Sequence, residues 1–300
     1  MTGVEGARAA GPGAAPSGHG GEVDLHVHST ASDGALAPET VVEAAARVGL
    51  SALALTDHDT LAGVAAAREA GNRLRLRVVA GVELSVLDGE QEVHLLGLHV
   101  ARVDALERDL AALRETRRAR AVKIVERLNA LGVPVTADQV FAESGAGAVG
   151  RPHVARALIA GGWVRDLREA FGRYLGTGRP ANVEKQRLSA ADGIRRIHDA
   201  GGLAVFAHPG ADGTLERVAA LAALGLDGLE VLHPSHSPAD VARLTALTES
   251  HGLVPSGGSD WHGTADGPRA LGAMRVPAGW LASQDARLAA RASRAAATFA

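Results

Sequence analysis

Two histidines near the start of the chain are spaced so that both could bind one metal ion. His26 and His28 lie in the segment Asp24-Leu25-His26-Val27-His28, and alternate residues of a strand point to the same side. Asp33 follows in a loop that could fold back toward them. Taken alone, the two histidines could also be unrelated polar residues at a strand end. Likewise, Asp33 could simply form a turn before Gly34.

A third histidine, His58, follows the short apolar segment 52–55. This pattern is typical of a site built at the end of a strand. The aspartates on either side, Asp57 and Asp59, could orient its imidazole or cap the next helix, and we expect capping for Asp59.

The other candidate ligands lie at or near the ends of further apolar segments: Glu83, His94, His208, Asp260 and His262. Each also has an ordinary explanation on its own. A single Glu at a strand end is commonly solvated, and His94 lies in an apolar run where a histidine can belong to the core.

Together these residues predict a metal centre with more than one ion. Six of the thirteen histidines and three carboxylates follow one strand-and-helix pattern. Nine nitrogen and oxygen ligands suit two or three divalent ions, and the chain has no cysteine to supply thiolate. Three such ions would give the site a charge of about +3, which attracts phosphate. A bridging water would be acidified and could attack phosphorus in line.

Strands and helices alternate on both sides of these residues. Apolar periodicity predicts strands at 23–28, 52–55, 76–82, 93–100, 203–207, 228–232 and 253–256. Helices are predicted at 37–48, 61–70 and 104–131, and another begins after Ser189 and ends before Gly201. The pattern predicts an α/β fold of parallel strands with helical crossovers and a site at the strand ends.

The middle of the chain differs from its two flanks. Residues 103–185 are helical in pattern without clear strands, which predicts a mainly helical insertion within a domain spanning 22–282. Residues 1–21 are expected to be a disordered leader, because they are rich in Gly, Ala and Pro. The Ala- and Arg-rich tail, 283–300, is expected to be either a terminal helix or a frayed end.

Charge and hydropathy narrow the classes of partner. The formal net charge is −3, which argues against binding of long nucleic acid. The local exception is Arg117-Arg118-Ala119-Arg120, which a solvated helix face explains equally well. No apolar run is long enough for a membrane span, and no secretory signal precedes the first strand. We therefore expect a cytoplasmic protein with no membrane association and no obligate protein partner.

Several segments resemble the motifs of the PHP family, the polymerase and histidinol phosphatase metal-dependent phosphoesterases. They are Asp24-Leu25-His26-Val27-His28-Ser29, Thr56-Asp57-His58-Asp59, Gly81-Val82-Glu83-Leu84-Ser85, Phe206-Ala207-His208-Pro209 and Gly258-Ser259-Asp260-Trp261-His262. The resemblance covers roughly 23–265 and includes all nine candidate ligands in order. It implies a distorted (β/α)7 barrel with three metal ions.

The resemblance also implies how the ligands divide among the ions. One ion would be held by His26, His28, Glu83 and Asp260. Glu83 would bridge to a second ion held by His94 and His208, and Asp33, His58 and His262 would hold the third. Manganese is the expected metal, with zinc or iron as alternatives. Glu83, Asp260 and His208 would act in catalysis through the hydroxide that the ions hold.

The segment Gly150-Arg151-Pro152-His153 resembles the bacterial nucleoside 3′,5′-bisphosphate phosphatase branch, which also trims short RNA from its 5′ end. It implies that Arg151 and His153 bind a substrate phosphate, although a helix start with a surface Arg and a buried His is the alternative. His236, and less so His233, could also touch substrate. The expected substrate is a small phosphorylated nucleotide or short oligonucleotide. The alternatives are a histidinol-phosphate phosphatase and a non-catalytic PHP module.

Overall fold

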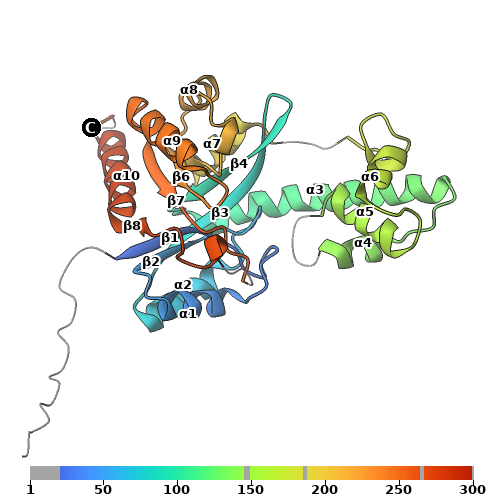
Figure 1. Cartoon of the computed structure of the whole chain (residues 1–300), viewed down its shortest axis with the longest axis horizontal. Coiled ribbons are helices and arrows are strands. Elements are labelled where there is room, and N and C mark those ends of the chain that lie inside the picture. The colour runs from blue at the N-terminus through green and yellow to red at the C-terminus, as the bar shows by residue number, and fades with distance from the viewer. Residues whose placement is uncertain (1–20, 145–148, 185–187, 264–266, 299–300) are drawn as a thin grey trace, which may run out of the picture.

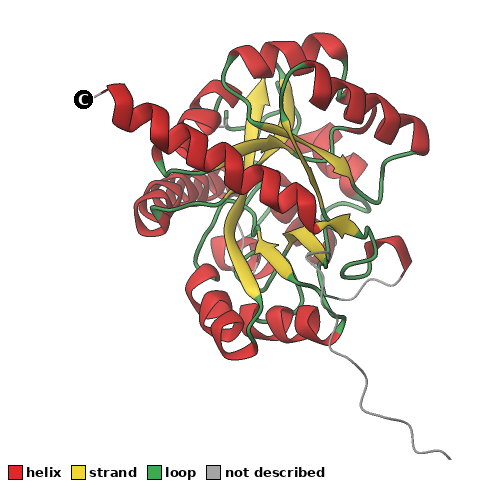
Figure 2. Ribbon diagram, turned by 90° about the vertical axis from the view of Figure 1, so that its left-hand side faces the viewer, coloured by secondary structure: helices red, strands yellow, loops and turns green. Residues whose placement is uncertain are grey.

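A single mixed sheet curls into a nearly closed barrel at the centre of the computed structural model (Figure 2). The structure describes residues 21–144, 149–184, 188–263 and 267–298, so the predicted leader lies almost wholly outside the described residues. The strands follow the order β7-β6-β5-β4-β3-β2-β1-β8. They are β1 (Glu22–Val27), β2 (Ala52–Leu55), β3 (Arg77–Asp88), β4 (Gln91–Leu98), β5 (Leu203–Phe206), β6 (Gly228–Leu232), β7 (Val254–Gly257) and β8 (Val276–Pro277).

The α/β prediction is confirmed, but the sheet is not wholly parallel. β4 runs antiparallel to both β3 and β5, and β8 runs antiparallel to β1. For β3 and β4 the physical reason is the short turn at 89–90, because two residues can join only antiparallel neighbours. The hairpin also carries β3 beyond β2, whose pairing stops at Leu55 opposite Ala80. Glu83 therefore lies inside a strand, yet beyond the end of its neighbour.

Helices cover the outside of the barrel (Figure 2). They are α1 (Pro38–Arg47), α2 (Val64–Leu74), α7 (Ala190–Asp199), α8 (Leu215–Ala223), α9 (Pro238–Ser250) and α10 (Ala278–Thr298). Ser189 caps α7 as predicted by accepting a hydrogen bond from the Asp192 N–H. The helices α8 and α9 were not predicted from the sequence. The terminal segment forms α10, the helical alternative for the tail.

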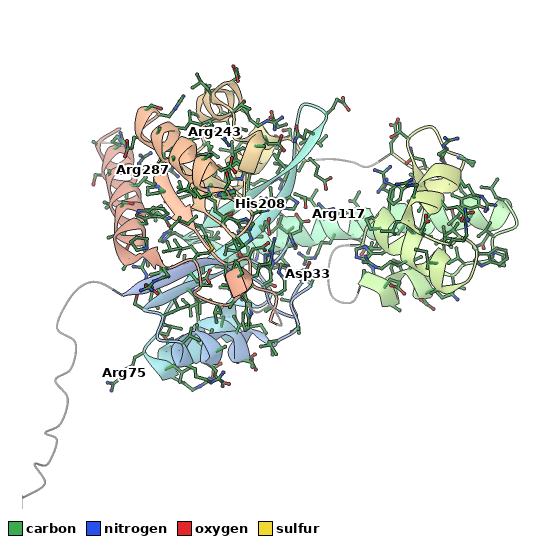
Figure 3. The ribbon with its side chains drawn as sticks, viewed as in Figure 1. Asp33, Arg75, Arg117, His208, Arg243 and Arg287 are labelled. Atoms are coloured by element: carbon green, nitrogen blue, oxygen red, sulfur yellow. The ribbon has the colours of Figure 1, made fainter. Side chains whose placement is uncertain are left out.

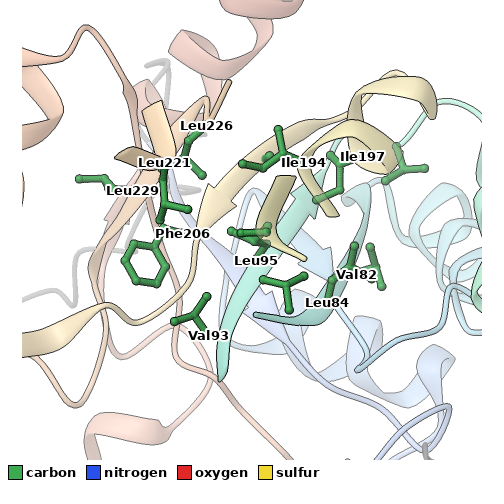
Figure 4. Close-up of a cluster of buried hydrophobic side chains, with 14 of the residues drawn as sticks. Val82, Leu84, Val93, Leu95, Ile194, Ile197, Phe206, Leu221, Leu226 and Leu229 are labelled. Carbon is green, nitrogen blue, oxygen red and sulfur yellow. The ribbon is translucent and has the colours of Figure 1, made fainter. Parts of the chain in front are cut away.

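The core lies between the sheet and its covering helices (Figure 4). Leu84, Leu95 and Phe206 from the strands pack with Ile194 and Ile197 of α7. The barrel closes where the residues after β7 meet β1. There the Asp260 N–H donates to the His26 carbonyl at 2.9 Å. Closure therefore brings candidate ligands from the start and the end of the barrel together.

The segment predicted as an insertion extends away from the barrel (Figure 1). It contains α3 (Val103–Ala130), α4 (Ala137–Ser144), α5 (Arg151–Ala160), α6 (Leu167–Ala170) and a π-helical turn at Phe171–Leu175. Its outer part has its own core, in which Ile124 and Leu128 of α3 pack with Val154 and Leu158 of α5. The start of α3 contributes Leu106 to the barrel core instead, so this helix belongs to both parts. None of the described helices combines the length and the apolar character that crossing a membrane requires.

Candidate metal centre

The carboxylate of Glu83 lies at the centre of five imidazoles and is fully buried. Its Oε1 is 2.6 Å from His94 Nδ1 and 2.9 Å from His208 Nε2. Its Oε2 is 3.0 Å from His26 Nε2, 3.2 Å from His28 Nε2 and 3.3 Å from His58 Nδ1. The two oxygens therefore face different groups of histidines, as a carboxylate shared between ions would.

One potential ligand group consists of His26, His28, Glu83 and Asp260. Asp260 Oδ1 lies 3.2 Å from His28 Nε2 and 3.5 Å from His26 Nε2. The approach of the two chain segments depends on Gly258. A Cβ there would lie 2.4 Å from the Cβ of His26 and 2.5 Å from its backbone nitrogen.

A second group lies on the other side of His28 and contains Asp33, His58 and His262. His262 Nε2 is 3.3 Å from Asp33 Oδ1, and His58 Nε2 is 3.8 Å from Asp33 Oδ2. His28 belongs to this group as well, because its Nδ1 is 3.7 Å from Asp33 Oδ1. The sequence reasoning had assigned His28 to one set alone.

The third group surrounds Oε1 of Glu83. His94 Nδ1 and His208 Nε2 are 3.3 Å apart, and both contact this oxygen. His58 also lies close enough to Glu83 and His94 to share an ion with them. His208 has a φ of 30°, a strained backbone conformation for a non-glycine residue and one that functional sites often contain.

The donor atoms fit divalent metal ions. Two ligand atoms about 2.1 Å from one ion, separated by a tetrahedral or octahedral angle, lie roughly 3.0–3.4 Å apart. The shortest contacts in the first two groups fall in that range. His28 is completely buried, and its Nε2 lies 3.2 Å from carboxylate oxygens of Glu83 and Asp260, yet among the described residues neither ring nitrogen has a hydrogen bond of normal geometry. A buried polar atom without a partner is costly, and metal coordination would satisfy it.

Without metal, the opposite charges perturb one another strongly. Burial alone lowers the pKa of His28, but Asp260 and Glu83 outweigh it and raise this pKa to about 9. Burial alone raises the pKa of Asp33, but His262 and His58 hold it at about 2. Burial acts on Glu83 in the same sense, yet His26, His208 and His28 lower its pKa well below the usual value. Metal ions would therefore displace protons from imidazoles that are already held by ionised carboxylates.

The helix cap predicted for Asp59 is wrong, and Asp57 holds a loop. Asp59 does not cap α2, which begins after Gly63. Its carboxylate accepts a hydrogen bond from the Ser85 N–H and forms an ion pair with Arg117. Asp57 accepts hydrogen bonds at 2.7 Å from the N–H and hydroxyl of Ser29 and from the hydroxyl of Ser32. It therefore fixes the loop that leads to Asp33.

Sequence reasoning missed Glu230, which is fully buried behind the metal centre in β6. Its Oε1 lies 3.0 Å from His26 Nδ1. An acidic residue inside the apolar segment 228–232 was a signal that could have found it, because a buried carboxylate requires polar partners. Arg269 was also missed, and it donates to Asp260 Oδ2 at 2.6 Å.

A cleft of about 370 Å³ separates the metal centre from the helical insertion. Asp33 and His58 line one wall, and Arg117, Arg120 and Arg151 line the insertion side. Asp33 and Arg117 both lie where the barrel faces the insertion (Figure 3). The arginine cluster on α3 is therefore not simply a solvated helix face: two of its members line the cleft, and Arg118 stacks on Phe141 with its guanidinium carbon 4.0 Å from the ring centre.

The three predicted substrate-binding residues differ in position. Arg151 and His153 line the cleft. Within the described part of the chain, the Arg151 guanidinium donates to neutral acceptors, the Leu175 carbonyl at 3.1 Å and Asn182 Oδ1 at 3.4 Å. His153 Nδ1 accepts from the Gly150 N–H at the start of α5. His236 is not among the cleft's lining residues. Its Nδ1 lies 2.9 Å from the Val231 carbonyl and its Nε2 accepts from the Gly210 N–H, so this geometry gives the substrate contact no support.

Comparison with known proteins identifies the family. Residues 24–128 match the model of the PHP domain. A 3′,5′-nucleoside bisphosphate phosphatase of Chromobacterium violaceum is 38% identical, and the match covers 83% of this chain and 90% of that protein. The chain belongs to the PHP family. This PHP protein is a metal-dependent phosphoesterase, as its sequence predicted.

Other relatives of this PHP protein are named for different activities. The 5′-3′ exoribonuclease Rnm of Salmonella typhimurium is 38% identical over 80% of this chain and 84% of its own length. A phosphoribosyl 1,2-cyclic phosphate 1,2-diphosphodiesterase of Eggerthella lenta is also 38% identical, over 85% of this chain and 99% of its own. The crystal structure of a Bifidobacterium adolescentis protein, assigned as a metal-dependent phosphoesterase, superposes with a TM-score of 0.71 at 33% identity. That match covers 88% of this chain and 96% of the other.

Proposed function

We propose that this phosphoesterase removes phosphate from small nucleotides that carry a second phosphate, nucleoside 3′,5′-bisphosphates among them. We propose release of 5′ nucleotides from short RNA as a second activity of the same site. The observation that carries this proposal is the cleft, in which arginines of α3 and α5 face the residues of the metal centre. The names of two relatives, a bisphosphate phosphatase and an exoribonuclease, support the same class of substrate.

We propose three ions, most simply manganese, held by the three predicted ligand sets. The sets are His26, His28, Glu83 and Asp260; Glu83, His94 and His208; and Asp33, His58 and His262. When bound, the ions would neutralise phosphoryl oxygens and lower the pKa of an attacking water. The proximity of His28 to the third set supports close spacing of the ions.

The chain itself would orient the substrate. With the scissile phosphate at the metal centre, the rest of the molecule would extend toward α3 and α5. Arg151 is suited to the second phosphate, because its planar fork matches phosphate oxygens and its present acceptors are neutral. His153 lies on the same helix turn at the cleft wall. We propose at most a minor substrate contact for His236, because both of its ring nitrogens contact backbone atoms.

The proposal also extends to where the protein works. We propose that it acts in the cytoplasm, and this rests on the small nucleotide and RNA substrates proposed above. Neither a membrane nor an obligate protein partner is needed for the reaction proposed. Fractionation of cells with the protein tagged at its C-terminus would test the location.

A substrate panel with manganese tests the activity. Purified protein should release phosphate from adenosine 3′,5′-bisphosphate faster than from the corresponding monophosphates. Short 5′-phosphorylated RNA, a ribose 1,2-cyclic phosphate and histidinol phosphate complete the panel. Preference for either of the last two over the bisphosphate would reject the proposed substrate class. No turnover of any substrate by protein with a full metal complement would favour a non-catalytic module.

A further inference from the structure

Glu230 links two histidines that belong to different proposed ligand sets. Its side chain is fully buried in β6. One carboxylate oxygen, Oε1, lies 3.0 Å from Nδ1 of His26 on β1. The other, Oε2, accepts a hydrogen bond of 2.7 Å from the backbone N–H of His208, which follows β5. A single carboxylate thus contacts two strand ends of the barrel. We propose that Glu230 is a positioning residue that prepares His26 and His208 to bind metal without binding an ion itself.

The contact with His26 determines which ring nitrogen is available. An ionised carboxylate can only accept hydrogen bonds, so His26 must donate its Nδ1–H to Glu230. The lone pair of the neutral ring is then on Nε2. That nitrogen lies 3.0 Å from Glu83 Oε2 and 3.5 Å from Asp260 Oδ1, inside the group of potential ligands. Glu230 therefore fixes both the ring orientation and the nitrogen presented to an ion.

The contact with His208 acts through the backbone. His208 has a φ of 30°, which is unfavourable for a residue with a Cβ. The hydrogen bond from its N–H to Glu230 helps to hold this conformation. In that conformation the ring places Nε2 at 2.9 Å from Glu83 Oε1. Loss of the acceptor would let the chain relax and withdraw the ring from the proposed second ion.

A direct ligand role for Glu230 is the competing interpretation, because His26, Glu230 and His233 lie close enough together to hold an ion. The contacts favour positioning. Each oxygen of Glu230 already faces one donor, and His233 Nδ1 lies 2.7 Å from the Ser235 hydroxyl. An ion in that group would require His26 to give up its Nδ1–H, and with it the orientation of Nε2 toward Glu83.

The test compares Glu230→Gln with a matched control, Asp227→Asn. Glutamine preserves the shape but has one acceptor oxygen, so either His26 or His208 loses its partner. Asp227 directly precedes the same strand and is also buried. Its Oδ2 lies 2.8 Å from Nε2 of a different histidine, His198. Among the described residues, the Asp227 side chain contacts His198, the Ala204 N–H and Arg291, and none of these is a proposed metal ligand. Metal-free protein would be titrated with Mn²⁺, and free ion followed by electron paramagnetic resonance.

We expect Glu230→Gln to weaken manganese binding about 10- to 100-fold, with activity returning toward the wild-type rate at high Mn²⁺. Asp227→Asn should bind manganese as the wild type does, even if it unfolds at a lower temperature. Wild-type affinity in Glu230→Gln, or an equal loss in Asp227→Asn, would overturn the positioning role. Loss of one ion per chain that no Mn²⁺ concentration restores would instead identify Glu230 as a ligand.

The inference rests on the proposed ligand sets, but not on the identity of the phosphoester. If the wild-type protein bound no manganese, the proposed ligand sets and the proposed role of Glu230 would both be rejected. If the wild-type protein bound manganese but cleaved none of the nucleotides, only the proposed substrate class would be rejected. Metal binding and turnover therefore separate the two failures.

Discussion

Arg117 of the insertion helix α3 forms an ion pair with Asp59, the residue that directly follows His58. Both side chains are largely buried, and Arg114 of the same helix donates to the Asp59 carbonyl at 2.6 Å. Asp59 has a φ of 52°, so two arginines of one helix hold the turn after His58 in an unusual conformation. The helix that carries the cleft arginines thus also fixes the loop that carries a proposed metal ligand.

Replacing Arg117 by Gln should impair both substrate binding and the position of His58. Because the change leaves the buried Asp59 carboxylate without its cation and removes a positive charge from the cleft, we expect kcat/KM for the bisphosphate to fall about 10-fold or more. Steady-state kinetics with saturating manganese would measure it. Arg118→Gln is the control, since Arg118 lies on the same helix but stacks on Phe141. Equal effects of the two changes would contradict the link between α3 and the centre.

Replacing Asp33 or His58 by Ala should reduce kcat about 100-fold or more, because either change removes a ligand of the proposed third ion. The fold should survive, since Asp33 is more than half exposed and His58 is partly exposed. Thermal unfolding of the metal-free variants would establish this. Metal content and kcat measured on the same samples are the test. Rates close to wild type in both variants would reject the third ligand set.

Replacing Arg151 by Ala should raise KM for the bisphosphate, because a charge-assisted hydrogen bond to phosphate contributes about 1.5–3 kcal/mol. The expected fall in kcat/KM is about 10- to 100-fold, with a smaller effect on a monophosphate that lacks the second anionic group. Arg156→Ala is a matched control: Arg156 is on the same helix α5 but pairs with Glu143 outside the cleft. Unchanged kinetics in Arg151→Ala would exclude this arginine from phosphate binding.

Metal binding should release protons at pH 7. The pKa of His28 in the metal-free protein is about 9, so its ring is protonated at pH 7 and must lose a proton to become a ligand. The affinity for manganese should therefore fall as the pH is lowered from 9 toward 6. Calorimetric titration in buffers of different ionisation enthalpy would count the released protons. Binding without proton release at pH 7 would show that His28 is neutral beforehand.

Gly258→Ala should destabilise the metal-free protein by about 1–3 kcal/mol or more, because the new methyl group would lie within 2.4–2.8 Å of His26. The same displacement should weaken metal binding by His26 and His28. Denaturant unfolding in the presence of EDTA isolates the effect on the fold. Gly279→Ala is the control, since a Cβ there meets nothing within 4 Å. If Gly258→Ala were as stable as the wild type, β1 and the segment after β7 could not be as close as the structure places them.

The residue types and local spacing of the chain predicted much of the site. The alternation in Asp24–His28 places two imidazoles on one side of a strand, and the apolar runs before His58 and His208 place these residues at strand ends. Such features depend on backbone periodicity within a few residues. The same local reasoning identified the helix after Ser189 and the long helix that became α3. It missed the antiparallel β4, although the signal was local: only Gly89 and Glu90 separate the two strands, and so short a loop joins antiparallel neighbours.

The tertiary structure alone decided how those residues meet. His26 and Glu230 are 204 positions apart, yet closure of the barrel brings their side chains to 3.0 Å. Tertiary packing also places His28 between two ligand groups, brings Arg117 of α3 to Asp59 and directs both ring nitrogens of His236 to the backbone. The sequence by itself determined which atoms could bind metal and phosphate, because that chemistry belongs to the side chains. Which atoms share an ion, and which only support a ligand, was decided by distances that packing sets across the whole chain.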